Sequence, residues 1–524
     1  MTAGLLAPPV SNPASAAPNP AESPTEIAFR AARTSALDRL AHTARLTPPG
    51  RYPVVAPGGR QWHTLPASSW MAGFFPGELW QAYELSGNRT WARRAAARQA
   101  DLASRAEDTS THDLGFVLFD SLGQDLRLTG DPAARRTLLT AAESLASRYV
   151  PAARTIRSWD GPEGQVRVIV DNMVNLELLF WAAKNGGSPG LRDIAVRHAL
   201  TTRDQLVRPN GSTFHSVRFD ETTGRRLWRG TVQGWRDSST WARGQSWAVY
   251  GFTTAYRETG DRRMLTVARR TADYALRHLP ADGVPYWDYG LARSRATFRD
   301  ASAGAVLASA LLELALADPV AKRRARYRAA AMHTLRSLTG PRYLAAAGAK
   351  KDARKGSAIL LHSHHNKAAP NAGTAYGDYY LLEALQRVQL QPSARRSLPV
   401  KRARADQALP GTPARAVLDR SHDTHWSAAG PAPRLTLDLG RSQHVSAVSV
   451  GWWQGRGITT RLRLQTSSDG RRWSTGRTVV SSGRGSRLET YDLRDRQARY
   501  VRLVGLAGGS SGASIAISTV RVRG

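Results

Sequence analysis

Three short joints of one kind constrain the fold of this chain more than any other feature of its sequence. Each places Gly between a Ser or Thr and an Asn or Asp, and each separates two segments with helical apolar periodicity. The joints are Ser86-Gly87-Asn88, Thr129-Gly130-Asp131 and Thr259-Gly260-Asp261. Gly ends a helix readily because it adopts the left-handed conformation, and the Asn or Asp that follows caps the next helix. The joints therefore predict antiparallel helix hairpins.

Helical periodicity recurs from about residue 26 to residue 390. Twelve segments of helix length lie near residues 26–46, 70–85, 89–105, 113–128, 132–148, 168–185, 190–206, 240–258, 262–278, 300–317, 321–338 and 375–390. Six such hairpins predict a toroid in which alternate helices line an inner ring, with a pocket at its open end. Two stretches interrupt the rhythm: residues 211–235 predict a β-hairpin, and residues 346–374 predict a long polar loop.

The composition changes after residue 390. Residues 391–415 are rich in Pro, Arg and Ala and predict a basic linker. From 416 to 524 the apolar period becomes two, which predicts a β-sandwich. Residues 1–25 predict a disordered leader or the remnant of a signal peptide, which favours export. The predicted fold class is α + β with two domains, 26–390 and 416–524.

The formal charge of +33 would be consistent with a protein that binds nucleic acid. Nearly all of it comes from Arg scattered along the chain, so solvated surfaces explain it better than a nucleic-acid site, although an anionic substrate would be attracted. There is no Cys, which excludes disulfides and thiolate chemistry. No apolar run reaches the length of a membrane span.

Two carboxylates stand next to apolar helical segments. Asp171 lies in VIVDNMVNLELLFW (168–181), and Asp113 follows His112 in THDLGFVLF (111–119). A buried Asp is more often a paired core residue than a catalyst. Two such residues, however, suit acid–base chemistry in which one carboxyl is held protonated and the other ionised.

Aromatic and polar residues occur near the predicted opening of the ring. Indole rings stack on sugars, and a guanidinium binds a carboxylate through two hydrogen bonds, although each type is more often structural. The candidates for substrate binding are Trp70, His215, Gln233, Trp241, Arg243 and Trp247. His362, His364 and His365 predict a polar loop and no metal site, because adjacent histidines do not easily converge on one ion.

Several long motifs of residues 30–390 resemble those of the unsaturated glucuronyl hydrolases. They are WMAGFFPGELWQAYE, THDLGFVLFDSLG, VDNMVNLELLFWAAK, GSTFHSVRFDETTG, TVQGWRDSSTWARGQSWAVYGF, DGVPYWDY with RDASAGA, and GDYYLLEAL. The resemblance implies an (α/α)6 barrel, with no catalytic cofactor, that removes a 4,5-unsaturated glucuronyl residue from the non-reducing end of lyase products.

The resemblance also implies the chemistry and the residues that perform it. An Asp protonates C4 of the vinyl ether, water adds at C5, and the hemiketal that forms opens with loss of the glycosidic bond. Asp171 matches the acid–base residue and Asp113 the second essential Asp. His215, Gln233, Trp241, Arg243, Trp247 and Trp70 match residues around the sugar. After LLH the chain departs from the family pattern, so sulfate preference stays open, with His362 and Lys367 as candidate contacts.

The C-terminal region resembles the discoidin, or factor 5/8 type C, module. THWSAAGPAPRLTLDLG, SSDGRRWS and ARYVRLVGL carry this resemblance. It implies a jelly-roll sandwich that binds polysaccharide, in some members with a structural calcium, and it favours an extracellular setting. Alternatives to the glucuronyl hydrolase are an unsaturated rhamnogalacturonyl hydrolase on the same fold, a non-catalytic glycan-binding protein and, with least support, a nucleic-acid-binding protein.

Overall fold

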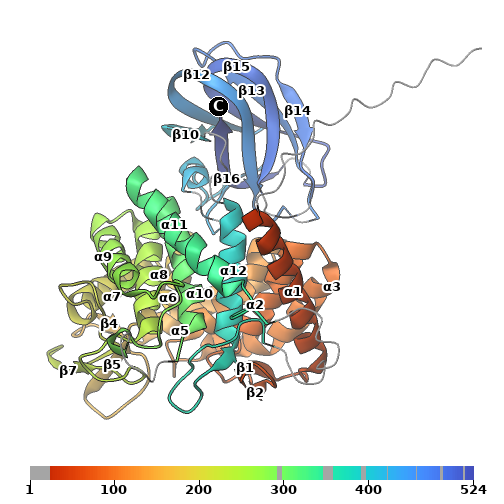
Figure 1. The fold of residues 1–524 in the computed structure, drawn as a ribbon. Helices are drawn as coiled ribbons and strands as arrows, with labels where there is room; N and C mark the ends of the chain where they lie inside the picture. Colours follow the sequence, from red (N-terminus) through yellow and green to blue (C-terminus); the bar gives the residue numbers. More distant parts are fainter. Residues whose placement is uncertain are drawn as a thin grey trace, which may run out of the picture.

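A computed structural model of the chain describes residues 24–291, 298–345, 358–390 and 397–524, except residues 420, 422, 456, 484, 486, 487, 512 and 513. Almost all of the predicted leader (1–25) and part of the predicted polar loop (346–374) lie outside the described residues. Figure 1 shows a helical body below and a smaller body of strands above it. The α + β class with a helical part followed by a sandwich is confirmed.

The helical body contains twelve α-helices within the described residues. They are α1 (Pro24–Leu46), α2 (Phe74–Ser86), α3 (Arg89–Gln99), α4 (Leu122–Thr129), α5 (Pro132–Ser147), α6 (Asn172–Lys184), α7 (Gly190–Leu206), α8 (Ala242–Thr259), α9 (Arg262–His278), α10 (Ala301–Ala317), α11 (Ala321–Leu338) and α12 (Ala375–Leu390). The segment predicted at 113–128 begins with a π-helical turn, η2 (Gly115–Phe119), before α4. A 3-10 turn, η1 (Ala100–Glu107), follows α3.

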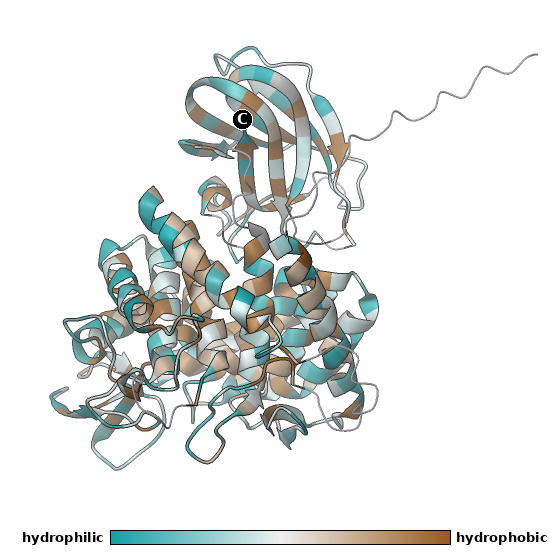
Figure 2. Ribbon diagram, viewed as in Figure 1, coloured by the Kyte–Doolittle hydropathy of each residue, from teal (hydrophilic) through white to brown (hydrophobic). Residues whose placement is uncertain are grey.

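Alternate helices form a closed inner ring. Contacts run from α2 to α4, from η2, which precedes α4, to α6, and then through α8, α10 and α12 back to α2, while each odd-numbered helix packs outside. Inner helices such as α10, with the sequence ASAGAVLASALLELALA, are buried on nearly every side, because neighbouring helices surround them. Figure 2 shows hydrophobic residues concentrated on these inner elements and hydrophilic residues on the outer ones. The predicted six-hairpin toroid is thus present.

The three sequence joints have the predicted geometry. Gly87, Gly130 and Gly260 end their helices with φ of 84°, 78° and 70°, in the left-handed region. The side chains that follow each accept a hydrogen bond from a backbone N–H of the next helix: Asn88 from Thr90, Asp131 from Ala133 and Asp261 from Arg263. These local interactions turn the chain back on itself at each hairpin.

Small antiparallel sheets lie at one end of the ring. The strands are β1 (Tyr52–Pro57), β2 (His63–Leu65), β3 (Tyr149–Val150), β4 (Thr155–Ile156), β5 (Gln165–Ile169), β6 (Ser216–Asp220), β7 (Arg226–Gly230) and β8 (Ala372–Thr374). The predicted hairpin is β6–β7, and the sequence analysis missed its third strand, β5, which pairs with β6. The segment predicted as a helix from 168 therefore starts as a strand.

The C-terminal unit is built around a separate hydrophobic core. Its strands are β9 (Ser397–Leu398), β10 (Arg402–Ala405), β11 (Trp426–Ala428), β12 (Arg434–Trp452), β13 (Arg461–Ser467), β14 (Arg477–Val480), β15 (Glu489–Leu506) and β16 (Ile515–Arg523). β9 and β10 correct the prediction of a linker, because they pair with β16 and β12. The sequence of β10 alternates exposed Arg with half-buried Ala, and the basic composition obscured this edge-strand pattern.

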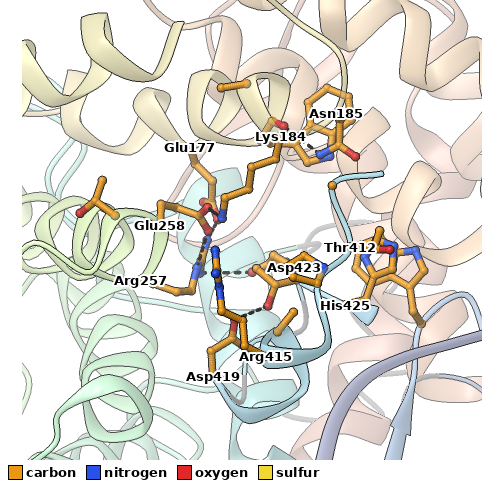
Figure 3. A pocket seen from close by; sticks show the side chains of 18 of the residues that line it. Glu177, Lys184, Asn185, Arg257, Glu258, Thr412, Arg415, Asp419, Asp423 and His425 are labelled. Carbon is orange, nitrogen blue, oxygen red and sulfur yellow. Dashed lines mark hydrogen bonds and ion pairs between the residues drawn. The ribbon is translucent and has the colours of Figure 1, made fainter. Parts of the chain in front are cut away.

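The two units enclose a cavity of about 850 Å³. Figure 3 shows Glu177, Lys184 and Arg257 of the helical body on one side and Asp423 and His425 of the C-terminal unit on the other. Trp453, which also lines this cavity, lies parallel to His425 with ring centroids 4.0 Å apart. No helix in the described part of the chain is long and apolar enough to cross a membrane.

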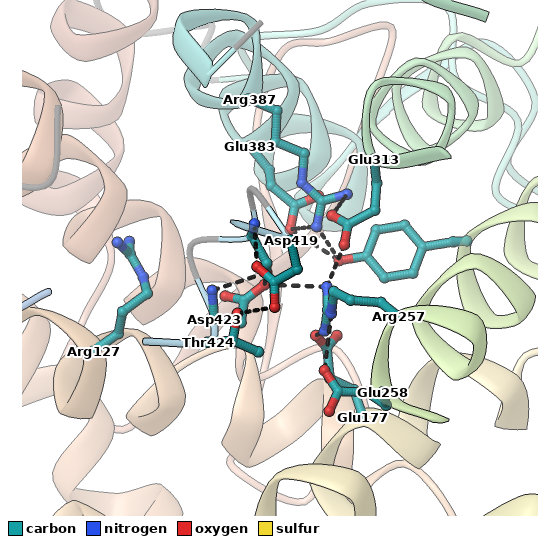
Figure 4. A network of polar contacts seen from close by, with 12 residues as sticks. Arg127, Glu177, Arg257, Glu258, Glu313, Glu383, Arg387, Asp419, Asp423 and Thr424 are labelled. Carbon is teal, nitrogen blue, oxygen red and sulfur yellow. Dashed lines mark hydrogen bonds and ion pairs between the residues drawn. The ribbon is translucent and has the colours of Figure 1, made fainter. Parts of the chain in front are cut away.

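A buried polar network lies beside this cavity (Figure 4). Arg257, near the end of α8, pairs with Glu177 and Glu313 of the helical body and with Asp423 of the C-terminal unit at 3.3 Å. Arg387 pairs with the same Glu313 at 2.9 Å. The charges of this network, called the rear network below, therefore have partners on several helices and on both units.

Candidate active site

The N-terminal ends of the six inner helices lie at the same end of the ring, opposite the rear network. The residues at these ends are Trp70 before α2, Asp113 before η2 and α4, Asp171 before α6, Trp241 before α8, Asp300 before α10 and Tyr376 in the first turn of α12. Helix N-termini carry unpaired N–H groups and partial positive charge. This end of the ring is therefore suited to an anionic ligand.

Backbone hydrogen bonds between neighbouring strands hold Asp113, Asp171 and His215 in one row. The links are His112 N–H to Ser158 O (3.0 Å), Ser158 N–H to Arg167 O (2.8 Å) and Val170 N–H to His215 O (2.9 Å). Strands joined in this way lie about 4.8 Å apart. Residues distant in sequence are thus brought together, and both predicted carboxylates belong to the same site.

Asp171 stands between β5 and the first turn of α6, with 7% of its surface exposed. Its Oδ2 lies 3.6 Å from His215 Nε2 and makes no hydrogen bond with the described residues. Burial raises the pKa of Asp171 to about 7; the Arg243 charge opposes this shift and the Asp113 charge adds to it. This carboxyl is therefore partly protonated at neutral pH, as a general acid must be.

His215 is held as a neutral ring that points its Nε2 at Asp171. Its Nδ1 accepts hydrogen bonds from the backbone N–H groups of Val232 (3.1 Å) and Gln233 (3.2 Å). Burial, with the Arg243 charge, lowers the pKa of His215 to about 3. Because Nδ1 is the acceptor, the single proton of the neutral ring resides on Nε2, which faces the Asp171 carboxyl.

Asp113 is buried but, unlike Asp171, is hydrogen bonded. Its Oδ2 accepts from the Thr111 hydroxyl at 3.0 Å, and its Oδ1 lies 3.3 Å from His112 Nε2. Burial lowers the pKa of His112, against the opposing effect of the Asp113 charge. The two carboxyls therefore have different environments: Asp113 Oδ2 accepts a hydrogen bond from Thr111, whereas Asp171 Oδ2 accepts none from the described residues.

The two sequence motifs that carry these carboxylates pack directly against each other. Gly115, two residues after Asp113, touches Asn175 of α6 so closely that an added Cβ would lie 2.6 Å from Asn175 Oδ1. The same oxygen accepts the backbone N–H of Phe116 at 2.9 Å. Asn175, one of the polar interruptions of α6, is thus used to fix the distance between the segments of Asp113 and Asp171.

Arg243 is 1% exposed, and its guanidinium binds groups of the protein itself. Nη1 donates to Asp300 Oδ2 at 3.2 Å, and Nη2 to Gln233 Oε1 at 2.8 Å. Both Nη atoms also donate to backbone carbonyls, those of His364 and His365. The sequence predicts that this guanidinium binds a ligand carboxylate. In the structure the guanidinium instead connects Gln233, α10 and the loop before β8.

The three predicted tryptophans differ in exposure. Trp70 is half-buried and stacks on Tyr376, with ring centroids 5.6 Å apart at 21°. Trp241 is 2% exposed and lies against His215, with centroids 4.6 Å apart. Trp247 is fully buried and packs on Phe116. Trp247 therefore supports the site from the core and offers no face to a sugar, which corrects its predicted role as a contact.

Several residues that shape this site were not predicted from the sequence. Asp300, inside the RDASAGA motif, caps α10 and binds Arg243. In the loop before β8, the His364 ring stacks on Trp287 at 4.5 Å, and His365 Nδ1 lies 3.1 Å from the Tyr376 hydroxyl. Periodicity could not find these contacts because they join distant loops. The predicted contacts there are His362, bonded to Asn371, and Lys367, which is exposed.

The cavity of Figure 3 is not part of this site. Asp171 precedes α6, whereas Lys184 at the other end of the same helix lines the cavity. At 1.5 Å per residue, the 13-residue helix separates the two by about 20 Å. The described residues contain no group of three or more His, Asp or Glu side chains that could hold a metal ion.

Comparisons with known proteins assign both units. A family model for the F5/8 type C domain matches residues 402–518. The chain is similar to the unsaturated glucuronyl hydrolase of Formosa agariphila (38% identical, 62% of this chain and 82% of the relative). It is also similar to that of Bacillus sp. strain GL1 (36% identical, 65% of this chain and 91% of the relative).

A solved structure gives the same assignment. The crystal structure of an unsaturated glucuronyl hydrolase specific for heparin matches with a TM-score of 0.65 and 36% identity, over 69% of this chain and 96% of the other. The helical ring and its site thus define a cofactor-independent glycosidase, here fused to an F5/8 type C domain. The chain belongs to the unsaturated glucuronyl hydrolase family.

Proposed function

We propose that this glycosidase removes a 4,5-unsaturated glucuronic acid residue from the non-reducing end of oligosaccharides made by polysaccharide lyases. The observation that carries the proposal is the Asp171 carboxyl, which is buried, has a pKa near 7 and keeps one oxygen without a hydrogen bond from any residue that the structure describes. An acid of this kind can protonate a carbon of the substrate at neutral pH, whereas an ordinary Asp is almost fully ionised there.

The proposed reaction is a hydration. Asp171 transfers its proton to C4 of the vinyl ether, and water adds at C5 while the Asp171 carboxylate accepts a proton from that water. The product is a hemiketal at C5. Its ring opens to a ketone at C5, and the hemiacetal left at C1 releases the remaining saccharide as an alcohol. One water is consumed and Asp171 regains its proton.

Neighbouring residues prepare Asp171 for this cycle. The charge of Asp113 favours the protonated form of Asp171 and the positive charge that develops on the sugar. The Nε2 of His215, 3.6 Å from Asp171 Oδ2, faces the carboxyl and favours one orientation of it. Trp70, with its half-exposed ring, is the proposed platform for the sugar, and Trp241 and Gln233 are the proposed walls.

The partial positive charge at this end of the ring supports an acidic sugar as the substrate. The six inner-helix N-termini favour the uronate carboxylate. Relatives point to the same class: three streptococcal relatives are unsaturated chondroitin disaccharide hydrolases, and one solved relative carries dGlcA-Glc-Rha-Glc. An unsaturated rhamnogalacturonyl disaccharide would test the alternative activity, that of an unsaturated rhamnogalacturonyl hydrolase.

The proposal is tested with a panel of lyase-made unsaturated disaccharides that differ in linkage and sulfation. Hydration removes the C4=C5 bond, so the near-ultraviolet absorbance of the unsaturated uronate falls with turnover. We expect this fall with at least one glucuronyl substrate and none with the rhamnogalacturonyl one. A folded protein that leaves the absorbance of every disaccharide unchanged would contradict the proposal.

The F5/8 type C domain belongs to the same proposal. We expect it to bind polysaccharide and the protein to act outside the cell, where lyase products are released. A structural calcium in this domain stays a prediction of the resemblance. A melting temperature that does not change on chelation and re-addition of calcium would contradict this prediction.

A further inference from the structure

Four adjacent strands of the C-terminal sheet present a polar outer face. β10, β12, β15 and β13 are hydrogen bonded in this order. Their buried residues alternate with outward ones: on β13, for example, Leu462 and Leu464 are buried whereas Arg461 and Arg463 are exposed. The outer face is solvent-accessible because its residues alternate with those of the core.

Cross-strand register gathers arginines on this face. They are Arg404 on β10, Arg434 on β12, Arg502 on β15, and Arg463 and Arg461 on β13, here called the basic face. Arg404 and Arg502 both lie opposite Thr436, and Arg434 and Arg463 both lie opposite Val504.

The register makes each arginine a diagonal neighbour of the next. Diagonal neighbours on adjacent strands are about 7 to 8 Å apart, and Arg461 follows Arg463 on the same strand at about 7 Å. The five guanidinium groups therefore form a continuous zigzag line that runs across the strands, from β10 to β13.

Little of this charge is neutralised by the protein. Arg434 faces Asp406 at 3.9 Å with both side chains exposed, and Arg502 donates to the neutral Gln465. Within the described residues, Arg404, Arg461 and Arg463 form no ion pair. Like charges on neighbouring strands repel each other, and an anion bound along the line would relieve this repulsion.

Arginines elsewhere on the protein are arranged differently. Arg323 and Arg326 of α11 both pair with Asp273, and Arg269 pairs with Asp318 through two hydrogen bonds. Acidic side chains thus lie beside these three arginines, whereas within the described residues Arg404, Arg461 and Arg463 of the basic face have none.

We propose that the basic face binds a polyanionic polysaccharide, with its sulfate or carboxylate groups along the arginine line. Guanidinium groups bind such groups through paired hydrogen bonds. An aromatic ring is also present: Trp473 is half-buried, and the Arg502 guanidinium lies 3.8 Å from its centroid. Only the choice of a polysaccharide over another polyanion rests on the proposed function. The surface is the outer face of strands, away from the catalytic end of the ring.

Affinity measurements with the full-length protein test this assignment. Heparin, its desulfated form and a double-stranded DNA of similar charge are the probes, and dissociation constants are measured by calorimetry between 50 and about 300 mM salt. The Arg461→Glu/Arg463→Glu variant should bind heparin at least about tenfold more weakly, and its log–log salt slope should fall by about two, one for each lost contact.

A matched variant separates the basic face from total charge. Arg192→Glu/Arg197→Glu, on exposed positions of α7, makes the same change in net charge and should leave heparin affinity unchanged. Equal loss in both double variants, no binding by the wild type, or DNA binding as tight as heparin binding would each overturn the proposal.

Turnover of an unsaturated disaccharide is recorded for every variant. The Arg461→Glu/Arg463→Glu protein should keep wild-type turnover, because these residues are far from Asp171. A wild type that binds heparin through these arginines but turns over no disaccharide would refute the proposed function alone. A wild type that turns over disaccharide but does not bind heparin would refute only the proposal that the basic face binds a polyanionic polysaccharide.

Discussion

The inner helices connect two buried polar clusters that are built in opposite ways. At their C-terminal ends, in the rear network, Arg257 pairs with Glu177, Glu313 and Asp423 (Figure 4). At their N-terminal ends, Asp171 Oδ2 and His215 Nε2 are buried and make no hydrogen bond with the described residues. Saturated charges stabilise a fold, whereas unsaturated ones are kept at a cost and can act on a ligand. The difference separates a structural cluster from the proposed catalytic one.

Removing the acidic proton of Asp171, at the N-terminal end of α6, should have the largest effect on turnover. We expect Asp171→Asn to lower kcat by about 10² to 10⁴, since this is what positioned proton transfer contributes. Substrate affinity, measured by calorimetry on the unsaturated disaccharide, should change little. Asp193→Asn, on the exposed surface of α7, is the control and should keep full turnover. Unchanged kcat in Asp171→Asn would place the acid elsewhere.

Removing the cation of the rear network should affect stability instead. Arg257→Met leaves buried carboxylates without their partner, which typically costs about 3 to 5 kcal/mol of unfolding free energy. Thermal and denaturant unfolding measure this loss. Arg262→Met, on the exposed side of α9, should cost far less. A catalytic role for the rear network would appear as lost turnover in an Arg257→Met protein that is still folded at low temperature.

Stability should also depend on pH through the Asp171 carboxyl. The pKa of Asp171 is raised to about 7 from an ordinary 3.8, so its folded form binds a proton more tightly than its unfolded form. Its contribution to stability is present in full below pH 3.8 and is lost as pH rises through 7, at about 1.4 kcal/mol for each unit between these values.

Asp171→Asn lacks this titration. Its unfolding free energy should therefore rise relative to wild type between pH 4 and pH 8, by up to about 4 kcal/mol. Urea unfolding at both pH values gives the comparison. A difference that does not depend on pH would show that Asp171 is ionised throughout this range.

The contact between the two units should have the smallest effect. Asp423 is partly exposed and lies 3.3 Å from Arg257, which keeps its other carboxylate partners. We expect Asp423→Asn to cost about 1 kcal/mol or less, seen as a small shift of the melting temperature. A loss as large as that of Arg257→Met would mean that the C-terminal unit is essential to the rear network.

Local signals made most of the helical fold predictable. The apolar periodicity predicted all twelve helices and the Gly joints predicted three of the turns between them, because capping and amphipathic burial depend on residues close in sequence. β5 was missed because its apolar residues run directly into α6, so one periodic pattern covered both elements. β10 was missed because a charged edge strand has the composition of a linker.

The site was predictable only in part. Motifs predicted Asp113, Asp171 and His215 as site residues, and the structure holds their segments side by side, but motifs did not predict that Arg243 would be engaged by Gln233 and Asp300. Nor could they predict the burial of Trp247. These features depend on which distant segments meet, and a single sequence carries no direct signal of that. The rear network was missed for the same reason, since it joins helices to a separate domain.

The pH dependence of turnover tests the central claim most directly. The claim is that Asp171 donates a proton from a carboxyl whose pKa is near 7. Absorbance loss from an unsaturated glucuronyl disaccharide should show kcat/KM falling tenfold for each pH unit above about 7, since only the protonated free enzyme reacts. A rate that stays constant from pH 6 to pH 9 would contradict the claim.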